Sequence, residues 1–246
     1  MQPRAFLITG AARRIGAAIA RALHSAGAHV LLHCNRSRAE AEFVAATLEA
    51  SRKGSTAILE ADLLDLEALP RLVDAAAAKF GRLDGLVNNA SSFAPTPFGT
   101  IDAGAWDDLI GTNLRAPLFL AQAAAPHLRK TRGGIVNIVD IHWERPLKDY
   151  VVYSIAKAGL AGLTRSLAVE LAPDVRVNGV APGAILWPDA EDHFPPHERA
   201  RIVGQTPLGR VGTPEDIAGA VKWLLLDAPY VTGQIVAVDG GRSVQL

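Results

Sequence analysis

Short apolar segments alternate with longer segments of helical period along almost the whole chain, and this alternation limits the possible folds more than any other feature. Several short segments are apolar on both faces, which is typical of parallel strands buried between helices. Strands and helices in strict alternation predict a doubly wound parallel sheet. We therefore expect an α/β fold built on one seven-stranded parallel sheet.

The alternation also gives the expected elements. The strands are predicted at Ala5–Thr9, His29–Cys34, Thr56–Glu60, Gly85–Val87, Ile135–Val139, Arg176–Val180 and Ile235–Val238. Helices are predicted near 14–27, 38–53, 66–80, 103–130, 151–172 and 214–227. The stretch near 183–207 contains four prolines and two histidines. Because a loop of that length in a compact domain usually forms a lid or binding loop, we expect a substrate loop there.

Composition narrows the kind of protein. The 246 residues, 49% of them hydrophobic, are enough for one large core, so we expect a single domain over 1–246. A formal net charge of zero gives no reason to expect nucleic acid or an anionic membrane as a partner. With Cys34 as the only cysteine and neither a signal segment nor a membrane helix in the sequence, we expect a cytoplasmic protein.

The first predicted strand runs into a turn with glycines at Gly10 and Gly16, and a helix follows directly. Glycines at such a turn let backbone amides and a helix N-terminus approach a pyrophosphate, whose charge the helix dipole favours. The pattern predicts a Rossmann-type dinucleotide site. Taken alone it is also compatible with glycines kept for steric reasons.

The end of the second strand indicates which dinucleotide is bound. A site for NAD commonly places an acid there for the ribose 2′-hydroxyl, whereas this chain has Arg36 and Ser37. Both side chains can donate hydrogen bonds to a 2′-phosphate, so we expect NADPH as the cofactor. The alternative is that Arg36 is an ordinary solvated arginine. His33 and Cys34 lie beside it, but no ligand-like spacing of histidines or second thiol accompanies them, and no metal site is predicted.

Tyr153 and Lys157 form a Y-x-x-x-K pair, whose spacing places both side chains on one face of a helix. An ammonium one turn away is expected to lower the pKa of the tyrosine and make it an acid–base group. Enzymes with this pair usually have a serine thirteen residues before the tyrosine, and here that position is Asp140. A carboxylate would repel the alkoxide formed from a ketone, but it can help to deliver a proton to a ring nitrogen. The alternatives are that Asp140 caps the following segment or pairs with Arg145.

Seven ordered motifs together resemble the short-chain dehydrogenase/reductase family over essentially the whole chain. They are Thr9-Gly10-x-x-x-Arg14-x-Gly16, Asp62-Leu63, Asn88-Asn89-Ala90, Asn113, Tyr153-x-x-x-Lys157, Asn178 with Pro182-Gly183, and Asp239-Gly240-Gly241. Three departures resemble one subgroup, the pteridine reductases: Arg14 replaces a glycine, the second strand ends in H-x-x-R-S, and Asp140 replaces the serine. The segment from Asn88 to Pro97 fits the same subgroup. Ile185 departs from it, because well-known members have a serine there.

The resemblance implies a role for each matched residue. The implied catalytic residues are Asp140, Tyr153, Lys157 and Asn113, the last bracing the lysine through a water. The implied cofactor contacts are Gly10, Arg13, Arg14, Ile15, Gly16, His33, Arg36, Ser37, Asp62, Leu63, Asn89, Ala90, Ser91, Tyr153, Lys157, Pro182 and Gly183. The implied substrate contacts are Arg14, Ser91, Phe93, Asp140 and Tyr153, with the Phe93 ring stacking on a pterin.

The resemblance therefore implies an NADPH-dependent pteridine reductase, a homotetramer, that reduces oxidised pterins or dihydropterins, or dihydrofolate, to the tetrahydro form. One alternative is a carbonyl reductase acting on 3-oxoacyl thioesters or sugars, with Asp140 as a tolerated substitute. Another is a non-catalytic NADP(H) sensor, against which the intact Tyr153, Lys157 and Asn113 argue. Simpler readings remain for two residues: Asn113 as a solvent-facing helix residue, and Phe93 as part of the core.

Overall fold

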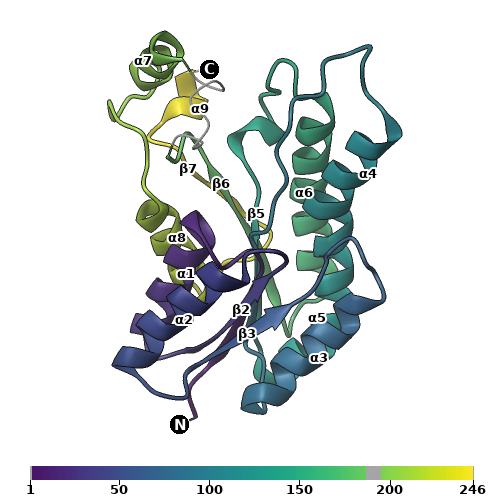
Figure 1. The fold of residues 1–246 in the computed structure, drawn as a ribbon, viewed down its shortest axis with the longest axis vertical. Coiled ribbons are helices and arrows are strands. Elements are labelled where there is room, and N and C mark those ends of the chain that lie inside the picture. Colours follow the sequence, from purple (N-terminus) through teal and green to yellow (C-terminus); the bar gives the residue numbers. More distant parts are fainter. Residues whose placement is uncertain (1, 187–194, 246) are drawn as a thin grey trace.

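The computed structural model describes residues 2–186 and 195–245. One parallel sheet of seven strands, in the order β3-β2-β1-β4-β5-β6-β7, runs through the molecule (Figure 1). The strands are β1 Ala5–Ile8, β2 His29–Cys34, β3 Thr56–Glu60, β4 Gly85–Asn88, β5 Gly134–Ile138, β6 Arg176–Pro182 and β7 Ile235–Val238. The order reverses between β1 and β4, and ligands of such sheets bind outside the carboxyl ends of the strands at that reversal. The predicted fold class is confirmed.

Helices cover both faces of the sheet (Figure 1). The helices α1 Arg14–Ser25, α2 Arg38–Ser51 and α8 Pro214–Leu226 pack on one face with a core that includes Phe6, Ile19 and Val221. The helices α3 Ala68–Phe80, α5 Ala116–Thr131 and α6 Val151–Glu170 pack on the other, around Leu86 and Leu120. The apolar residues predicted from helical period therefore make two cores, one on each side of the sheet.

The predicted helix at 103–130 was wrong in one respect. It divides into α4 Ala103–Ile110, a π-helical turn at Gly111–Arg115, and α5. In this turn the amide of Ala116 donates to the carbonyl oxygen of Gly111, five residues back. Pro117 follows and has no amide hydrogen to continue the usual ladder, which favours the wider turn. Asn113 lies in the middle of it.

The stretch near 183–207 was predicted as irregular, and this was also wrong in part. Residues 187–194 lie outside the described residues, but Pro196–Gly204 form the helix α7. Proline in its first turn, where no intrahelical amide is needed, fits this start. The sequence analysis also gave no place to the short helix α9 Arg242–Gln245 or the 3₁₀ turn η2 Ile141–Trp143. In Figure 1, α7 and α9 lie together, beyond the ends of β6 and β7.

A chain of buried hydrogen bonds joins two strands of the sheet to α6. Nδ2 of Asn88 on β4 donates to Oδ1 of Asn137 on β5 at 2.8 Å, and Nδ2 of Asn137 donates to Oγ1 of Thr164 on α6 at 2.9 Å. The Thr164 hydroxyl donates in turn to the carbonyl oxygen of Leu160 at 2.8 Å. Because broken polar pairs are costly in a core, this chain fixes α6 against the sheet.

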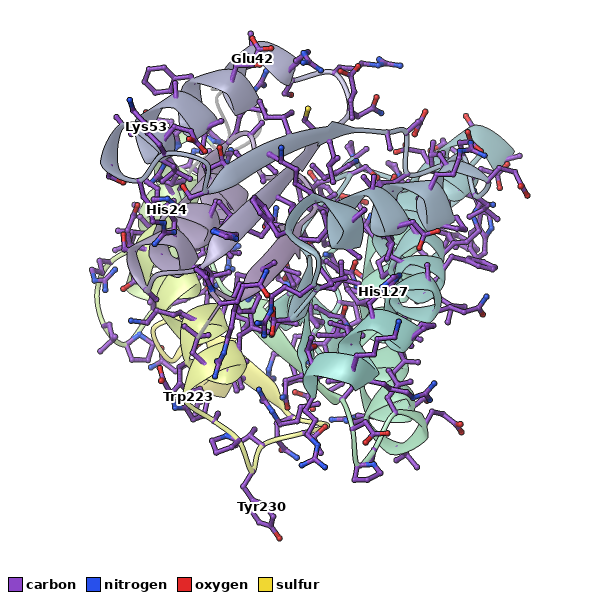
Figure 2. All side chains as sticks on the ribbon, turned by 90° about the horizontal axis from the view of Figure 1, so that it is seen from below. His24, Glu42, Lys53, His127, Trp223 and Tyr230 are labelled. Atoms are coloured by element: carbon purple, nitrogen blue, oxygen red, sulfur yellow. The ribbon has the colours of Figure 1, made fainter. Side chains whose placement is uncertain are left out.

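Polar contacts also hold helices together at the surface. His127 on α5, labelled in Figure 2, is 3.0 Å from a carboxylate oxygen of Asp74 on α3, so these two helices are joined by a polar contact as well as by apolar packing.

Tyr230 projects fully exposed from the loop between α8 and β7 (Figure 2). Within residues 2–186 and 195–245, no helix has both the length and the apolar character needed to cross a membrane.

Candidate active site

A cavity of about 940 Å³ opens at the carboxyl ends of the strands. Its volume lies toward the upper end of the roughly 300–1,000 Å³ typical of small-molecule sites. Of the predicted site residues, all line it except Asn113, Lys157 and Pro182. Pro182 is buried at the end of β6, and its neighbour Gly183 lines the cavity. The fold thus gathers residues from distant parts of the sequence around one space.

The glycine turn between β1 and α1 has the geometry that a bound phosphate requires. Gly10 has a φ of +63°, and a Cβ at Gly16 would overlap the carbonyl oxygen of Gly10. No side chain caps the first turn of α1, whose N-cap residue is Arg13. The amides at the start of this helix therefore have no side-chain acceptor, as an anion site needs. The residues present fit a dinucleotide pyrophosphate.

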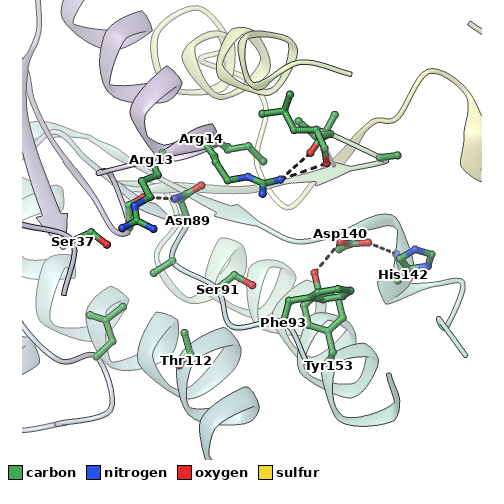
Figure 3. A pocket seen from close by; sticks show the side chains of 18 of the residues that line it. Arg13, Arg14, Ser37, Asn89, Ser91, Phe93, Thr112, Asp140, His142 and Tyr153 are labelled. Carbon is green, nitrogen blue, oxygen red and sulfur yellow. Dashed lines mark hydrogen bonds between the residues drawn. The ribbon is translucent and has the colours of Figure 1, made fainter. Parts of the chain in front are cut away.

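Asn89 and Thr9 hold this turn against the end of β4. Nδ2 of Asn89 donates to the carbonyl oxygens of Thr9 at 2.9 Å and Gly10 at 3.1 Å (Figure 3). The amides of Asn89 and Ala90 both donate to the Thr9 hydroxyl, at 2.9 and 3.0 Å. Asn89 and Ala90, expected near the nicotinamide ribose, thus also support the glycine turn.

His33 braces the turn from the other side. Its Nδ1 accepts from the amide of Gly10 at 3.2 Å, and its Nε2 contacts the carbonyl oxygen of Ala61 at 3.1 Å. Burial lowers the pKa of this imidazole, which favours the neutral ring that this pairing requires. His33 borders the cavity, yet both ring nitrogens are engaged with the backbone. The structure therefore gives it a bracing role, and its expected place around the adenosine phosphate stays a prediction.

Arg36 and Ser37 follow β2 at the cavity rim. Arg36 is exposed, and it makes no hydrogen bond or ion pair within the part of the chain that the structure describes. Arg13, by contrast, forms an ion pair with Glu40. Arg36 is thus an available cation next to the hydroxyl of Ser37, in the place where the sequence predicts the 2′-phosphate.

Tyr153 on α6 and Asp140 after β5 meet at the inner end of the cavity. The Tyr153 hydroxyl donates to Oδ2 of Asp140 at 2.8 Å, and Oδ1 accepts from the amide of His142 at 2.9 Å (Figure 3). The reading of Asp140 as a cap of the following segment is confirmed, since it begins the 3₁₀ turn. Its catalytic role stays a prediction, with which the contact to the tyrosine is compatible. The carboxylate is fixed by one bond and presents the other oxygen to the reactive hydroxyl.

Lys157 lies behind this pair, one turn along α6. Its Nζ donates to the carbonyl oxygen of Ile138 at 2.9 Å and is 5.5 Å from the centre of the Tyr153 ring. Only 2% of the residue is exposed. Burial lowers its pKa from 10.5 to about 8, an effect that the Asp140 carboxylate partly opposes. The ammonium is therefore close to the tyrosine but does not line the cavity.

The expected lowering of the Tyr153 pKa was wrong for this chain. The pKa of Tyr153 is raised well above its usual value, first by burial and then by the charge and hydrogen bond of Asp140. A phenolate beside a carboxylate would be repelled, and the serine usual at this position has no such charge. Tyr153 consequently keeps its proton at neutral pH and donates a hydrogen bond to Asp140.

Phe93 forms an aromatic wall next to the tyrosine. It stacks on Tyr150 with ring centres 4.4 Å apart and meets the Tyr153 ring edge-on at 4.8 Å. It is 41% exposed and lines the cavity, so the reading of Phe93 as a core residue was wrong. Because Tyr150 supports the ring, Phe93 is held in place without being covered completely.

Asn113 holds the segment that leads to Phe93. Its Oδ1 accepts from the Ser91 hydroxyl at 2.6 Å, and its Nδ2 donates to the carbonyl oxygens of Ser92 and Leu109, each at 2.9 Å. It is 1% exposed, so the reading as a solvent-facing helix residue was wrong. The direct contacts of its side chain are with the 91–92 segment, while the contact with Lys157 implied by the resemblance stays a prediction.

Arg14 adopts a left-handed backbone conformation with φ 49°, which favours glycine. Its guanidinium donates to the carbonyl oxygens of Ile185 and Leu186, both at 3.4 Å (Figure 3). The side chain therefore connects the phosphate turn with the segment after β6. A residue that keeps a strained conformation at a ligand site is commonly there for its side chain.

Several cavity residues were missed by the sequence analysis. His142, Leu147, Glu198, Arg201, Ile202 and Arg242 line the cavity, and Tyr150 supports Phe93. His142 lies two residues after Asp140, and Arg242 directly follows the Asp239-Gly240-Gly241 motif, so their closeness to matched motifs was a usable signal. Glu198, Arg201 and Ile202 belong to α7, for which the sequence gave no such signal.

The chain was compared with protein families and curated proteins. A family model described as enoyl-(acyl carrier protein) reductase matches residues 10–243. Pteridine reductase 1 of Leishmania tarentolae is 40% identical over 97% of this chain and 96% of its own length. The 3beta-hydroxysteroid dehydrogenase 1 of Eggerthella lenta is 36% identical over 99% of this chain and 95% of its own.

A third relative, a 3-oxoacyl-(acyl-carrier-protein) reductase of Staphylococcus aureus, is 36% identical over 96% of both chains. The relatives therefore share nearly the whole length of the chain but differ in the substrates that their names give. Together with the seven-stranded parallel sheet, they show that the chain is an oxidoreductase and belongs to the short-chain dehydrogenase/reductase family.

Proposed function

We propose that this chain is an NADPH-dependent pteridine reductase that reduces dihydropterins, and fully oxidised pterins or dihydrofolate, to the tetrahydro form. The observation that carries this proposal is the 2.8 Å hydrogen bond from the Tyr153 hydroxyl to the Asp140 carboxylate, beside the aromatic wall of Phe93. The similarity to a protein named pteridine reductase 1 supports it.

The residues at the glycine turn and after β2 fit NADPH. Amides at the start of α1 are available to its pyrophosphate, and Arg36 and Ser37 to its 2′-phosphate. When bound there, NADPH supplies the hydride of the reaction. The role of the protein is then to hold the acceptor next to it and to supply a proton.

Phe93 suits a flat heteroaromatic acceptor. Its ring is fixed by Tyr150 and faces the cavity, so a pterin can stack on it at little entropic cost. Arg14 and Ser91, from the two neighbouring turns, lie within the same cavity. Arg14 can donate hydrogen bonds to ring nitrogens and oxygens, and the Ser91 hydroxyl, which donates to Asn113, can accept one from a ring N–H or amino group.

Tyr153 and Asp140 supply the proton as a pair. Hydride addition to the carbon of a ring C=N bond moves the electron pair of that bond to nitrogen, which must gain a proton. Tyr153 is protonated at neutral pH and already shares its proton with Asp140, so the pair holds one transferable proton. Transfer leaves a phenolate beside the Asp140 carboxylate. The Lys157 ammonium, 5.5 Å from the centre of the tyrosine ring, offsets part of this charge, and a proton from water restores the Tyr153 hydroxyl.

Asp140 also argues against a ketone substrate. Reduction of a ketone develops an alkoxide close to the tyrosine hydroxyl, and the carboxylate 2.8 Å from that hydroxyl would repel it.

The second candidate function is carbonyl reduction. It is favoured by the similarity to relatives named as a hydroxysteroid dehydrogenase and a 3-oxoacyl reductase.

Oxidation of NADPH measured side by side with dihydrobiopterin, dihydromonapterin, dihydrofolate and a panel of ketones separates the candidates. We expect turnover with at least one pterin or folate and little with ketones. Turnover of ketones alone would establish the second candidate. Binding of NADPH without oxidation by any of these compounds would instead indicate a non-catalytic sensor.

A further inference from the structure

Arg242 is a buried cation at the edge of the cavity, and none of the residues that the structure describes pairs with it. It is the first residue of α9, is 7% exposed, and lines the cavity. Its side chain makes no hydrogen bond or ion pair with any residue in 2–186 or 195–245, and its Nε is buried without a partner. Buried guanidinium groups nearly always have acceptors, because they stay charged and cannot recover their hydration.

The acidic groups around Arg242 are already engaged. Asp239 accepts from the amides of Gly241 at 2.9 Å and Ser243 at 2.7 Å, which fixes the turn before α9. Glu198 on α7 forms an ion pair with Arg201, whose Nε donates to it at 2.8 Å. Asp140 accepts from Tyr153 and His142. These three carboxylates lie near enough to interact with the charge of Arg242, but no described residue forms a hydrogen bond or an ion pair with its guanidinium.

We propose that Arg242 forms a subsite for an oxyanion, carboxylate or phosphate, on the side chain of the substrate. Planar guanidinium groups bind such oxyanions with two parallel hydrogen bonds, and a desolvated position strengthens these bonds. Arg242 and Asp140 line the same cavity, so a ligand held at Asp140 can extend toward α9. The proposal rests on the proposed function for the identity of the substrate and narrows it to pterins with an anionic side chain.

Two sources of this oxyanion are compatible with a pterin ring. The glutamyl tail of dihydrofolate carries carboxylates, and dihydroneopterin monophosphate carries a phosphate, whereas dihydrobiopterin has a neutral side chain. The ratios of kcat/KM among these three substrates measure the preference for an anionic side chain. A variant that lowers the activity on all substrates equally leaves these ratios unchanged. Arg242→Gln should lower kcat/KM for the preferred anionic substrate at least tenfold more than for dihydrobiopterin, mainly through KM.

Two further variants test why kcat/KM for the anionic substrate falls. Arg242→Lys keeps the positive charge but cannot form two parallel hydrogen bonds, so it should recover part of the preference for the anionic substrate over dihydrobiopterin. Arg71→Gln removes an exposed arginine on α3, away from the cavity, and should leave the ratios within twofold of the parent. Melting temperature and NADPH binding identify any variant that fails to fold. Equal losses on all three substrates in a folded Arg242→Gln variant, or no loss, would overturn the proposal.

Calorimetric binding of p-aminobenzoylglutamate and inorganic phosphate, in the presence of NADP⁺, gives a measurement that needs no turnover. Binding of either probe by the parent, weakened at least tenfold in Arg242→Gln, supports the subsite and shows which oxyanion it prefers. If that binding is seen while no pterin or folate is reduced, the proposed function fails and the subsite stands. Absence of binding together with unchanged substrate ratios removes the subsite alone.

Discussion

The hydroxyl of Tyr153 donates to Oδ2 of Asp140 at 2.8 Å, and the two residues are thirteen positions apart in the sequence. In this arrangement a tyrosine with a raised pKa and an acidic side chain share one proton. The pair replaces the tyrosine–serine arrangement that the family pattern predicts. Its chemistry should therefore be visible in variants of Asp140.

Asp140→Ala should lower turnover with dihydropterin by about 10²-fold or more, which is the scale of a lost acid–base group. NADPH affinity should be kept, because the phosphate contacts expected at the glycine turn and at Arg36 do not involve Asp140. Asp140→Ser should help any ketone activity more than pterin reduction. Steady-state rates and NADPH titrations measure both effects. If Asp140→Ser reduced pterins at nearly the parent rate, the carboxylate would not be required for the reaction and the role of Asp140 would be structural.

Arg36→Ala should weaken NADPH binding by about 1.5–3 kcal/mol and leave NADH binding almost unchanged, because the lost contact exists only with the 2′-phosphate. Fluorescence titration with both nucleotides measures this difference. Arg38→Ala is a matched control, since Arg38 is exposed on α2, pairs with Glu42 and does not line the cavity. An equal loss of NADH affinity in Arg36→Ala would contradict the assignment.

Phe93→Ala should raise KM for pterins and leave NADPH affinity nearly unchanged. The variant removes the wall supported by Tyr150 but touches neither the glycine turn nor the Tyr153–Asp140 hydrogen bond. We expect a loss of about 0.5–1.5 kcal/mol in pterin binding, the scale of one stacked aromatic contact. Phe98→Ala serves as the control, because Phe98 is 90% exposed and lies outside the cavity lining. An unaltered pterin KM in Phe93→Ala would show that the substrate binds elsewhere.

Lys157 should make stability depend on pH. Its pKa is about 8 in the folded chain against 10.5 for the free group, so the unfolded state binds more protons between these values. Below pH 8 both states carry the charge and the cost of its burial is complete; as pH rises through 8 the folded lysine loses its proton and that cost disappears. Stability due to this group therefore increases with pH in this window.

The free energy of unfolding of the parent, relative to that of Lys157→Met, should rise by about 1.5 kcal/mol between pH 8 and 9.5. Urea denaturation at a series of pH values measures it. Lys148→Met, which removes an exposed lysine, should follow the parent throughout. Parallel curves for the parent and Lys157→Met would mean that the buried lysine titrates at its ordinary pKa.

Much of the fold could be predicted because its signals are local. All seven strands were predicted to within two residues at either end, since buried parallel strands such as β2 are continuous apolar runs. The π-helical turn was not predicted. It depends on Pro117, which has no amide hydrogen to donate to a carbonyl oxygen of the preceding turn. Helix α7 was not predicted either, because its sequence is rich in charged residues and has no apolar periodicity. Ile202 is its one buried residue.

The site residues that belong to sequence motifs could be predicted, whereas the properties that depend on how side chains pack in three dimensions could not. Residues of matched motifs, such as Gly10, Ser91 and Tyr153, meet at one cavity as expected. The raised pKa of Tyr153 was not foreseen, because it follows from burial and from the distance to Asp140. The support of Phe93 by Tyr150 depends on two rings 57 residues apart in sequence and 4.4 Å apart in space.

The hydrogen-bonded chain from Asn88 through Asn137 to Thr164 allows α6 only one axial setting. A slide of one helical turn, about 5.4 Å, would move Thr164 away from Asn137 and leave buried polar groups unpaired at about 1–3 kcal/mol each. The buried residues of α6 about one turn either side of Thr164 are Leu160, Ala161 and Ala168, whose side chains cannot hydrogen-bond to Asn137. The height of Tyr153 above the sheet is therefore set from within the core, so it does not depend on the length of the loops at either end of α6.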